Sequence, residues 1–269
     1  MMKSEYRTFF GFMREPFGSD IAAKDILVTP SINGVSERIH YAMRLGAIAL
    51  VTGEIGSGKS TALRYVIRHL DASEYRILNV VASSGSILEL YRQILSELGM
   101  DVASNSRAVM SRQIKKEILE MVNEKIQTLL VIDEASLLRL DVFSELHTLT
   151  QFSNDSKTFL PIILAGQSNL VDNMKYRNSI PLASRVVGKS HLKSIDLKAM
   201  KQYLNHHLSI AGVKRDIFDD AAVTAIHQGS GGLFRKANHL ARGAIIVASK
   251  NQSATVTSGH VRTAASEIF

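Results

Sequence analysis

The sequence contains no cysteine. Disulfide bonds, thiolate metal sites and cysteine nucleophiles are therefore excluded, and the absence fits a reducing cytoplasm. No apolar stretch reaches the roughly 18 residues that a membrane-spanning helix needs, and residues 1–20 do not resemble a signal peptide. We therefore expect a soluble, cytoplasmic protein without a transmembrane segment.

The chain also lacks any strong compositional bias. Of its 269 residues, 45% are hydrophobic and 21% are charged, which excludes a disordered, collagenous or low-complexity protein. The length is sufficient for one large domain, or for one large and one small domain, with a substantial core.

Acidic residues are outnumbered by basic ones. The chain has 32 lysines and arginines against 25 aspartates and glutamates, a net charge of +7. Residues 191–269 hold ten basic and five acidic residues, together with six of the nine histidines. This surplus favours anionic partners, and it is typical either of a solvated basic face or of a nucleic-acid contact.

Short runs rich in β-branched residues alternate with longer amphipathic stretches up to about His191. The alternation is typical of a parallel sheet with crossover helices, and it predicts an α/β fold. The expected strands are residues 47–52, 75–81, 128–132, 159–165 and a weaker run at 186–192.

After about Ser194 the strand pattern stops. Three or four helices are expected there, with breaks near residues 212–216 and 229–232. A helical tail behind an α/β body predicts a small lid domain. The expected parts are residues 1–45, an N-terminal segment and first helix packed on the core; residues 46–193, the α/β domain; and residues 194–269, the helical lid.

A glycine-rich loop follows the first expected strand and precedes a helix. Residues 53–60 read GEIGSGKS and match the pattern G-x-x-x-x-G-K-[ST]. Glycines permit successive amides to turn inward around phosphate oxygens, and the helix that begins near Lys59 adds the positive end of its dipole. Lys59 would reach the β- and γ-phosphates, and the Ser60 hydroxyl would ligate Mg²⁺. The alternative is a glycine-rich turn that binds no nucleotide.

The sequence thus predicts ATP and Mg²⁺ as ligands. The residues expected to bind the nucleotide here are Gly53, Glu54, Ile55, Gly56, Ser57, Gly58, Lys59, Ser60 and Thr61.

Two carboxylates end the third expected strand. Asp133 and Glu134 follow the apolar run LLVI, a weak signal alone but a strong one in a chain with a phosphate-binding loop. Asp133 would hold Mg²⁺ through water, and Glu134 would orient and polarise an attacking water. In a P-loop kinase the second substrate provides the acceptor hydroxyl, and no carboxylate is needed here to activate water. The second acid therefore points towards hydrolysis.

Three further polar side chains are candidates for sensing the γ-phosphate. Gln167 follows the fourth expected strand, where its amide could contact the γ-phosphate or simply cap the next helix. Arg177 and Arg185 precede the last strand, and either could reach the γ-phosphate of a neighbouring subunit or be an ordinary surface arginine. The sequence alone does not choose between these two arginines.

Arg235 lies in the first turn of an expected lid helix, after Gly231 and Gly232. A cation at this position does not favour the helix dipole. Contact with the nucleotide would explain the residue, and a surface salt bridge would also.

Together these features resemble an AAA+ ATPase with the P-loop fold. The opening is more specific: YRTFFGF at residues 6–12, EPF at residues 15–17 and VTGEIGSGKS at residues 51–60 resemble the ExeA-type ATPases, the general secretion pathway protein A family. The ATPase module of that family is also similar to transposition helpers of the TniB, TnsC and MuB kind. The resemblance extends from Tyr6 to about Ala248.

The resemblance implies roles for two residues and an assembly. Phe17 and its neighbours would line the adenine pocket, although core packing would equally explain the aromatic residues of the opening. Arg185 would act in trans, so the chain would form a homo-oligomer, as a ring or a filament.

Several functions are compatible with these expectations. The first is an ATP-dependent regulator of transposition that binds duplex DNA and recruits or stimulates a transposase. The second is a secretion-assembly ATPase that acts on protein partners, and the third is a nucleotide-gated scaffold with negligible turnover. Secretion-type members continue into a membrane span, whereas this sequence ends at Phe269, so the first is the expected one. Its candidate DNA contacts are Arg107, Arg112, Lys115, Lys116 and the basic lid.

Overall fold

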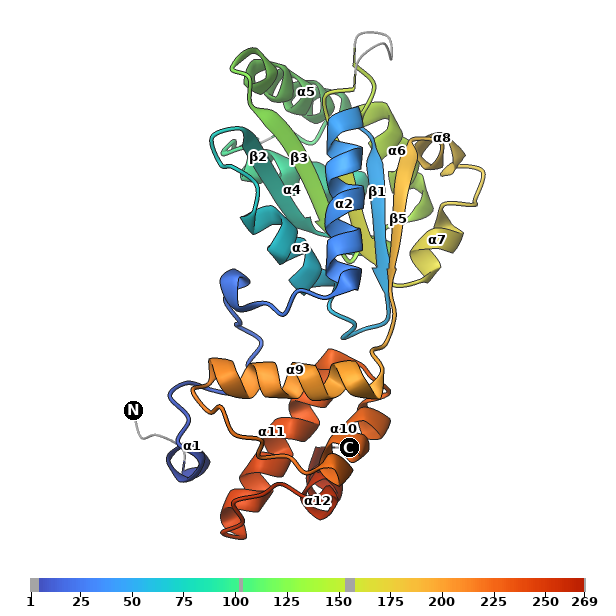
Figure 1. The fold of residues 1–269 in the computed structure, drawn as a ribbon. Coiled ribbons are helices and arrows are strands. Elements are labelled where there is room, and N and C mark those ends of the chain that lie inside the picture. The colour runs from blue at the N-terminus through green and yellow to red at the C-terminus, as the bar shows by residue number, and fades with distance from the viewer. Residues whose placement is uncertain (1–4, 102–103, 153–157, 269) are drawn as a thin grey trace. The chain divides into compact units, whose positions relative to one another are not determined.

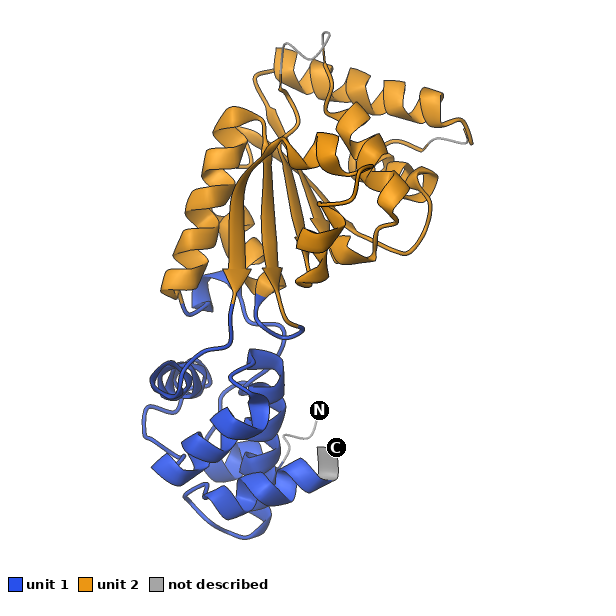
Figure 2. Ribbon diagram, turned by 90° about the vertical axis from the view of Figure 1, so that its right-hand side faces the viewer, with its two compact units in different colours: residues 1–27, 55–58, 193–269 blue, residues 28–54, 59–192 orange. Residues whose placement is uncertain are grey.

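The structure is a computed structural model that describes residues 5–101, 104–152 and 158–268. It contains two compact units, shown in different colours in Figure 2. The α/β unit consists of residues 28–54 and 59–192. The helical unit consists of the described residues within 1–27, 55–58 and 193–269.

Five parallel strands form the sheet of the α/β unit, in the order β2-β3-β4-β1-β5. Strands β1, β2, β3 and β5 are labelled in Figure 1. Their bounds are β1 Ile48–Gly53, β2 Tyr75–Val81, β3 Gln127–Asp133, β4 Ile162–Gly166 and β5 Val186–Leu192. The predicted parallel sheet is therefore confirmed. Strand β4 begins later than residue 159, because Pro161 has no N–H group for the ladder.

Helices cover both faces of this sheet. Alternate residues of β1 point to opposite faces, so Ile48 and Leu50 pack with α4, α5 and α6, while Ala49 and Val51 lie on the face of α2 and α3. The helices are α2 Pro30–Leu45, α3 Lys59–Arg68, α4 Ile87–Glu97, α5 Arg107–Asn123, α6 Leu140–Leu149, α7 Asn169–Asn173 and α8 Ile180–Ala183, with a 3-10 turn, η2, at Ala135–Leu137.

The helical unit contains the predicted helical C-terminal region. Its helices are α1 Glu5–Phe10, α9 Leu197–Ile210, α10 Asp220–Ser230, α11 Phe234–Lys250 and α12 Ser258–Ile268, with a 3-10 turn, η1, at Ala23–Asp25. Asp196 and Asp219 cap α9 and α10 by accepting main-chain N–H groups at 2.7 and 2.6 Å. Gly231 ends α10 with a left-handed φ of 60°, near one of the expected breaks.

The N-terminal aromatic residues belong to the core of the helical unit. Phe10, Phe12 and Phe17 are buried there among residues of α9, α10 and α11. The Met13 N–H also donates to the Ala211 carbonyl at 2.8 Å. Residues 5–27 thus group with the C-terminal helices, while α2 groups with the sheet; the sequence expects residues 1–45 as one segment on the α/β core. Burial of the aromatic rings accounts for this difference.

None of the helices within the described ranges is long and apolar enough to cross a membrane.

A histidine is buried in the helical core. The His207 ring stacks on Phe17 with a centroid distance of 5.2 Å, and it lies 4.5 Å from the Tyr203 ring. Burial, with a smaller contribution from neighbouring His206, lowers the pKa of His207 to about 4. His207 is therefore neutral in the folded protein at pH values where an unfolded histidine is already protonated.

We predict that this histidine destabilises the protein in acid. Below the unfolded pKa of about 6.5, the unfolded chain binds a proton that folded His207 does not, so the free energy of unfolding falls between pH 6.5 and 4 by at most about 3 kcal/mol. His207→Phe keeps a planar ring and removes the imidazole group that binds this proton. Urea unfolding at pH 7.5 and pH 5 measures the loss, which should be smaller in His207→Phe than in the wild type.

Exposed His239 provides the matched control, since His239→Phe makes the same substitution outside the buried cluster of rings. Equal losses of stability in the wild type and in His207→Phe would refute the prediction.

Candidate functional site

The glycine-rich loop leaves β1 at Gly53 and enters α3 at Lys59. Gly56 and Gly58 have φ angles of 84° and 94°, in the left-handed region that favours glycine. The Lys59 side chain is only 6% exposed, and its Nζ donates to the carbonyls of Gly53 and Glu54, both at 3.0 Å. The ammonium group is thereby held close to the main chain of the loop.

Ser57 indicates that the loop is suited to phosphate. Its side chain is 3% exposed, and its Oγ has no hydrogen-bond partner in the described part of the chain. A buried hydroxyl without a partner is costly, and a phosphate oxygen would provide the missing acceptor. The loop therefore combines a buried hydroxyl, a buried ammonium group and glycine-dependent main-chain geometry. All three fit the phosphate groups of a nucleotide.

The two predicted metal ligands lie together. Ser60 Oγ donates to Asp133 Oδ2 at 2.8 Å. Ser60 is in α3, whereas Asp133 is the last residue of β3. Mg²⁺ usually takes one or two protein oxygens and completes its shell with phosphate and water. No group of three or more carboxylate or imidazole side chains that could hold a metal is found within the described ranges. The donor set fits a magnesium–nucleotide complex.

Glu134 follows β3 in an unusual main-chain conformation. Its φ and ψ are 52° and 30°, a left-handed conformation in a residue other than glycine. Its N–H donates to Asp133 Oδ1 at 2.8 Å, so the two oxygens of Asp133 accept from Glu134 and Ser60. The main chain at Glu134 is thus linked directly to the carboxylate that precedes it.

Gln167 follows β4, the strand next to β3 in the sheet. Its main-chain N–H donates to Ser136 Oγ at 3.2 Å. The segments carrying Glu134 and Gln167 therefore meet at the carboxyl edge of two neighbouring strands.

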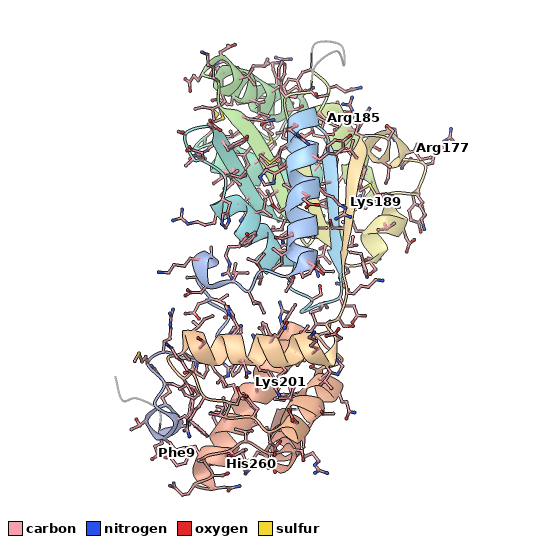
Figure 3. The ribbon with its side chains drawn as sticks, viewed as in Figure 1. Phe9, Arg177, Arg185, Lys189, Lys201 and His260 are labelled. Atoms are coloured by element: carbon pink, nitrogen blue, oxygen red, sulfur yellow. The ribbon has the colours of Figure 1, made fainter. Side chains whose placement is uncertain are left out.

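The two candidate arginines lie elsewhere in the α/β unit (Figure 3). Arg177 is exposed between α7 and α8, whereas Arg185 is half-buried and directly precedes β5. The Arg185 carbonyl accepts from the N–H of Ile48, the first residue of β1, at 3.0 Å. Strand β1 then runs about 17 Å, at about 3.3 Å per residue, before it reaches the phosphate-binding loop. Arg185 therefore lies at the amino ends of the strands, whereas this chain's own phosphate-binding loop lies at their carboxyl ends.

Arg235 contacts the loop through its main chain. It is the second residue of α11, and its N–H donates to the Gly56 carbonyl at 3.3 Å. A Cβ placed on Gly56 would lie 2.7 Å from the Arg235 Cβ. The helical unit thus brings together two residues that are far apart in sequence, and the side chain of Arg235 is exposed.

Phe17 is buried, with 2% exposure and a left-handed φ of 58°. Its ring contacts His207 and, edge to face at 6.0 Å, Phe218. Core packing therefore accounts for the residue, and its role in an adenine pocket stays a prediction.

The sequence does not single out two features that the structure places beside these residues. Thr52, just before the loop, has its Oγ1 3.1 Å from Nδ1 of His191 at the end of β5. Ser136, two residues after Glu134, bonds the main chain of Gln167. Single histidines and serines are too common for spacing to reveal such contacts.

The sequence of the chain is similar to that of proteins of known families. Residues 43–174 match the family described as AAA domain. General secretion pathway protein A of Aeromonas hydrophila is 26% identical over 265 residues, which cover 98% of this chain and 48% of that protein. ATP-dependent target DNA activator B of Escherichia phage Mu is 27% identical over 179 residues, 64% of this chain and 54% of that protein. The chain spans about half the length of the curated relatives it matches.

Two solved structures illustrate the similar fold. Cdc6p of Pyrobaculum aerophilum superimposes with a TM-score of 0.72 at 14% identity, covering 94% of this chain and 70% of that one. The ORC1 protein of Aeropyrum pernix, solved in complex with DNA, gives a TM-score of 0.72 at 17% identity. The superposition covers 99% of this chain and 71% of that one.

At these identities the structural likeness shows the fold, and the curated relatives confirm the resemblance that the motifs indicate. Residues 43–174 match an AAA domain, the chain has the fold of AAA+ P-loop proteins, and its sequence is related to both general secretion pathway protein A and the phage target DNA activators.

Proposed function

We propose that this protein is an ATPase that binds Mg-ATP in the loop 53–61 and hydrolyses it. The hydrogen bond between Ser60 and Asp133 carries the proposal, because it joins the hydroxyl of the phosphate-binding loop to the carboxylate of β3. Lys59 would bind the β- and γ-phosphates, while Ser60 and Asp133 would hold Mg²⁺. The bound ion would neutralise charge on the phosphate oxygens.

Glu134, the carboxylate next to Asp133, indicates whether the γ-phosphoryl group is transferred to water or to another acceptor. Glu134 would accept a hydrogen bond from a water molecule and orient its oxygen for attack on the γ-phosphorus, with ADP as the leaving group. Gln167, on the neighbouring strand, would contact the γ-phosphate. A kinase needs no such carboxylate beside its metal ligand, so this pair supports hydrolysis.

Glu134→Gln should separate binding from turnover. The amide keeps the shape of the side chain but polarises water poorly, so the ATPase rate should fall by at least about a hundredfold. ATP should still bind, since Lys59, Ser60 and Asp133 are unchanged. Phosphate release and retention of labelled ATP measure the two effects.

Lys59→Ala provides the contrasting variant, because it removes the cation at the phosphates and should abolish nucleotide binding itself. Normal turnover in Glu134→Gln would contradict the assignment of this carboxylate.

We further propose that the ATP site is completed by a neighbouring copy of the chain. Arg185 lies at the far end of the sheet from its own loop, at the start of β5. It could therefore contact a γ-phosphate only in another subunit. A guanidinium group suits that role, because it donates two parallel hydrogen bonds to phosphate oxygens. The assembly would be a ring or a filament.

Mixing two inactive variants tests this shared site. Arg185→Ala should lower turnover by at least about a hundredfold while leaving nucleotide binding intact. In a mixture with Glu134→Gln, some interfaces pair an intact Glu134 with an intact Arg185, so part of the ATPase activity should return. Arg177→Ala is the matched variant for the other candidate. If mixing restores no activity, Arg185 does not act in trans.

As a biological role we propose ATP-dependent binding of duplex DNA in transposition, with recruitment or stimulation of a transposase. The net charge of +7 supports an anionic partner. A related phage protein is described as an ATP-dependent target DNA activator, and a structure of similar fold was solved in complex with DNA. Assembly of a secretion apparatus is the second candidate, supported by the match to general secretion pathway protein A along almost the whole chain.

DNA retention distinguishes these two roles. With ATP and Mg²⁺ present, the DNA-binding role predicts that duplex DNA is retained at low salt and released as salt rises. About five phosphate contacts would give a slope near −4.5 in a plot of log affinity against log salt concentration. Fluorescence anisotropy of labelled duplex at 50 and 200 mM salt measures it. No binding at 50 mM salt would exclude this role and leave the secretion role.

A further inference from the structure

The main chain at Glu134 requires support from its surroundings. A residue other than glycine is rarely left-handed, and such a conformation persists only where neighbouring contacts hold it. Glu134 has a φ of 52°, and the turn η2 follows it directly. The N–H of Leu137 donates to the Glu134 carbonyl at 2.9 Å, which closes this turn. The turn therefore determines the direction in which the Glu134 side chain leaves β3.

Ser136 fixes this turn to the next strand. Its side chain is 8% exposed, and its Oγ accepts the main-chain N–H of Gln167 at 3.2 Å. This hydrogen bond links the turn after β3 to the first residue after β4. The segments that carry the carboxylate of Glu134 and the amide of Gln167 are thus joined through one hydroxyl.

Gly166 makes the close approach possible. A Cβ on this residue would lie 2.8 Å from Ser136 N, 3.0 Å from Ser136 Oγ and 3.1 Å from Ser136 Cβ. Gly166 is not among the glycines with a left-handed φ, so lack of space, rather than main-chain conformation, requires glycine here. The end of β4 therefore packs directly against the turn.

We propose that Ser136 is a positioning residue for hydrolysis, whose hydroxyl holds Glu134 and Gln167 in one arrangement at the γ-phosphate. The inference rests on the proposed ATPase function. Ser136 would act through Glu134 and Gln167 and not on the nucleotide itself.

Ser136→Ala removes the acceptor and adds no bulk. We expect the maximal ATPase rate to fall by about ten- to a hundredfold, the effect of a small misplacement of catalytic groups, with the affinity for ATP within about twofold of wild type. The amide of Gln167 should also exchange its hydrogen faster, and this measurement needs no nucleotide. Ser136→Thr retains the oxygen and should restore most of the rate.

Two further variants separate positioning from general loss of stability. Gly166→Ala keeps the hydroxyl but pushes the turn away from β4, so it should lower the rate without abolishing ATP binding. Ser104→Ala is the matched control: its hydroxyl also accepts a main-chain N–H, that of Ser106 at 3.1 Å, at the start of α5. It should leave the rate unchanged.

An unchanged maximal rate in Ser136→Ala would overturn the proposal. A loss of rate that only follows a loss of ATP affinity or of folded protein would overturn it as well. Failure of the proposed function looks different, because the wild type itself would then hydrolyse no ATP, and the role of Ser136 would be withdrawn with it.

Discussion

The hydrogen bond between Ser60 and Asp133 depends on the order of the strands. Strand β4 lies between β1 and β3, and all three are parallel, so the loop after β1 and the carboxylates after β3 reach the same edge of the sheet. A shift of β3 by one residue would turn Asp133 to the opposite face. In the observed register of β3 on β4, Leu130 pairs with Ile162, Val131 with Ile163 and Ile132 with Leu164. The site is therefore a consequence of sheet packing.

Much of this arrangement can be predicted from sequence. The β-branched runs predict the five strands, since buried parallel strands are almost continuously apolar. The loop 53–60 and the pair at 133–134 predict a phosphate site because such chemistry requires particular residue types at particular spacings. The first strand residue of β4 is harder to predict, because the apolar run includes Phe159 and Leu160 while Pro161 has no N–H group to donate.

Other features depend on contacts that the sequence does not encode locally. The left-handed conformation of Glu134 arises from the turn that follows it. Glutamate rarely adopts this conformation, so the residue type does not predict it. The bond between Ser136 and Gln167 joins residues 31 positions apart. The grouping of Phe17 with His207 and Phe218 likewise requires the fold of the whole helical unit. In each case tertiary packing, rather than local propensity, decides the outcome.

Gly56 illustrates how two demands can act on one position. Its φ of 84° disfavours any side chain, and the Arg235 Cβ lies only 2.7 Å from the place where a Cβ on Gly56 would be. Relaxing the backbone strain alone would thus not make alanine acceptable, because the beginning of α11 would also have to retreat. A side chain at this position would therefore require a compensating shift in a helix about 180 residues further along the chain, which couples this one loop residue to the beginning of α11.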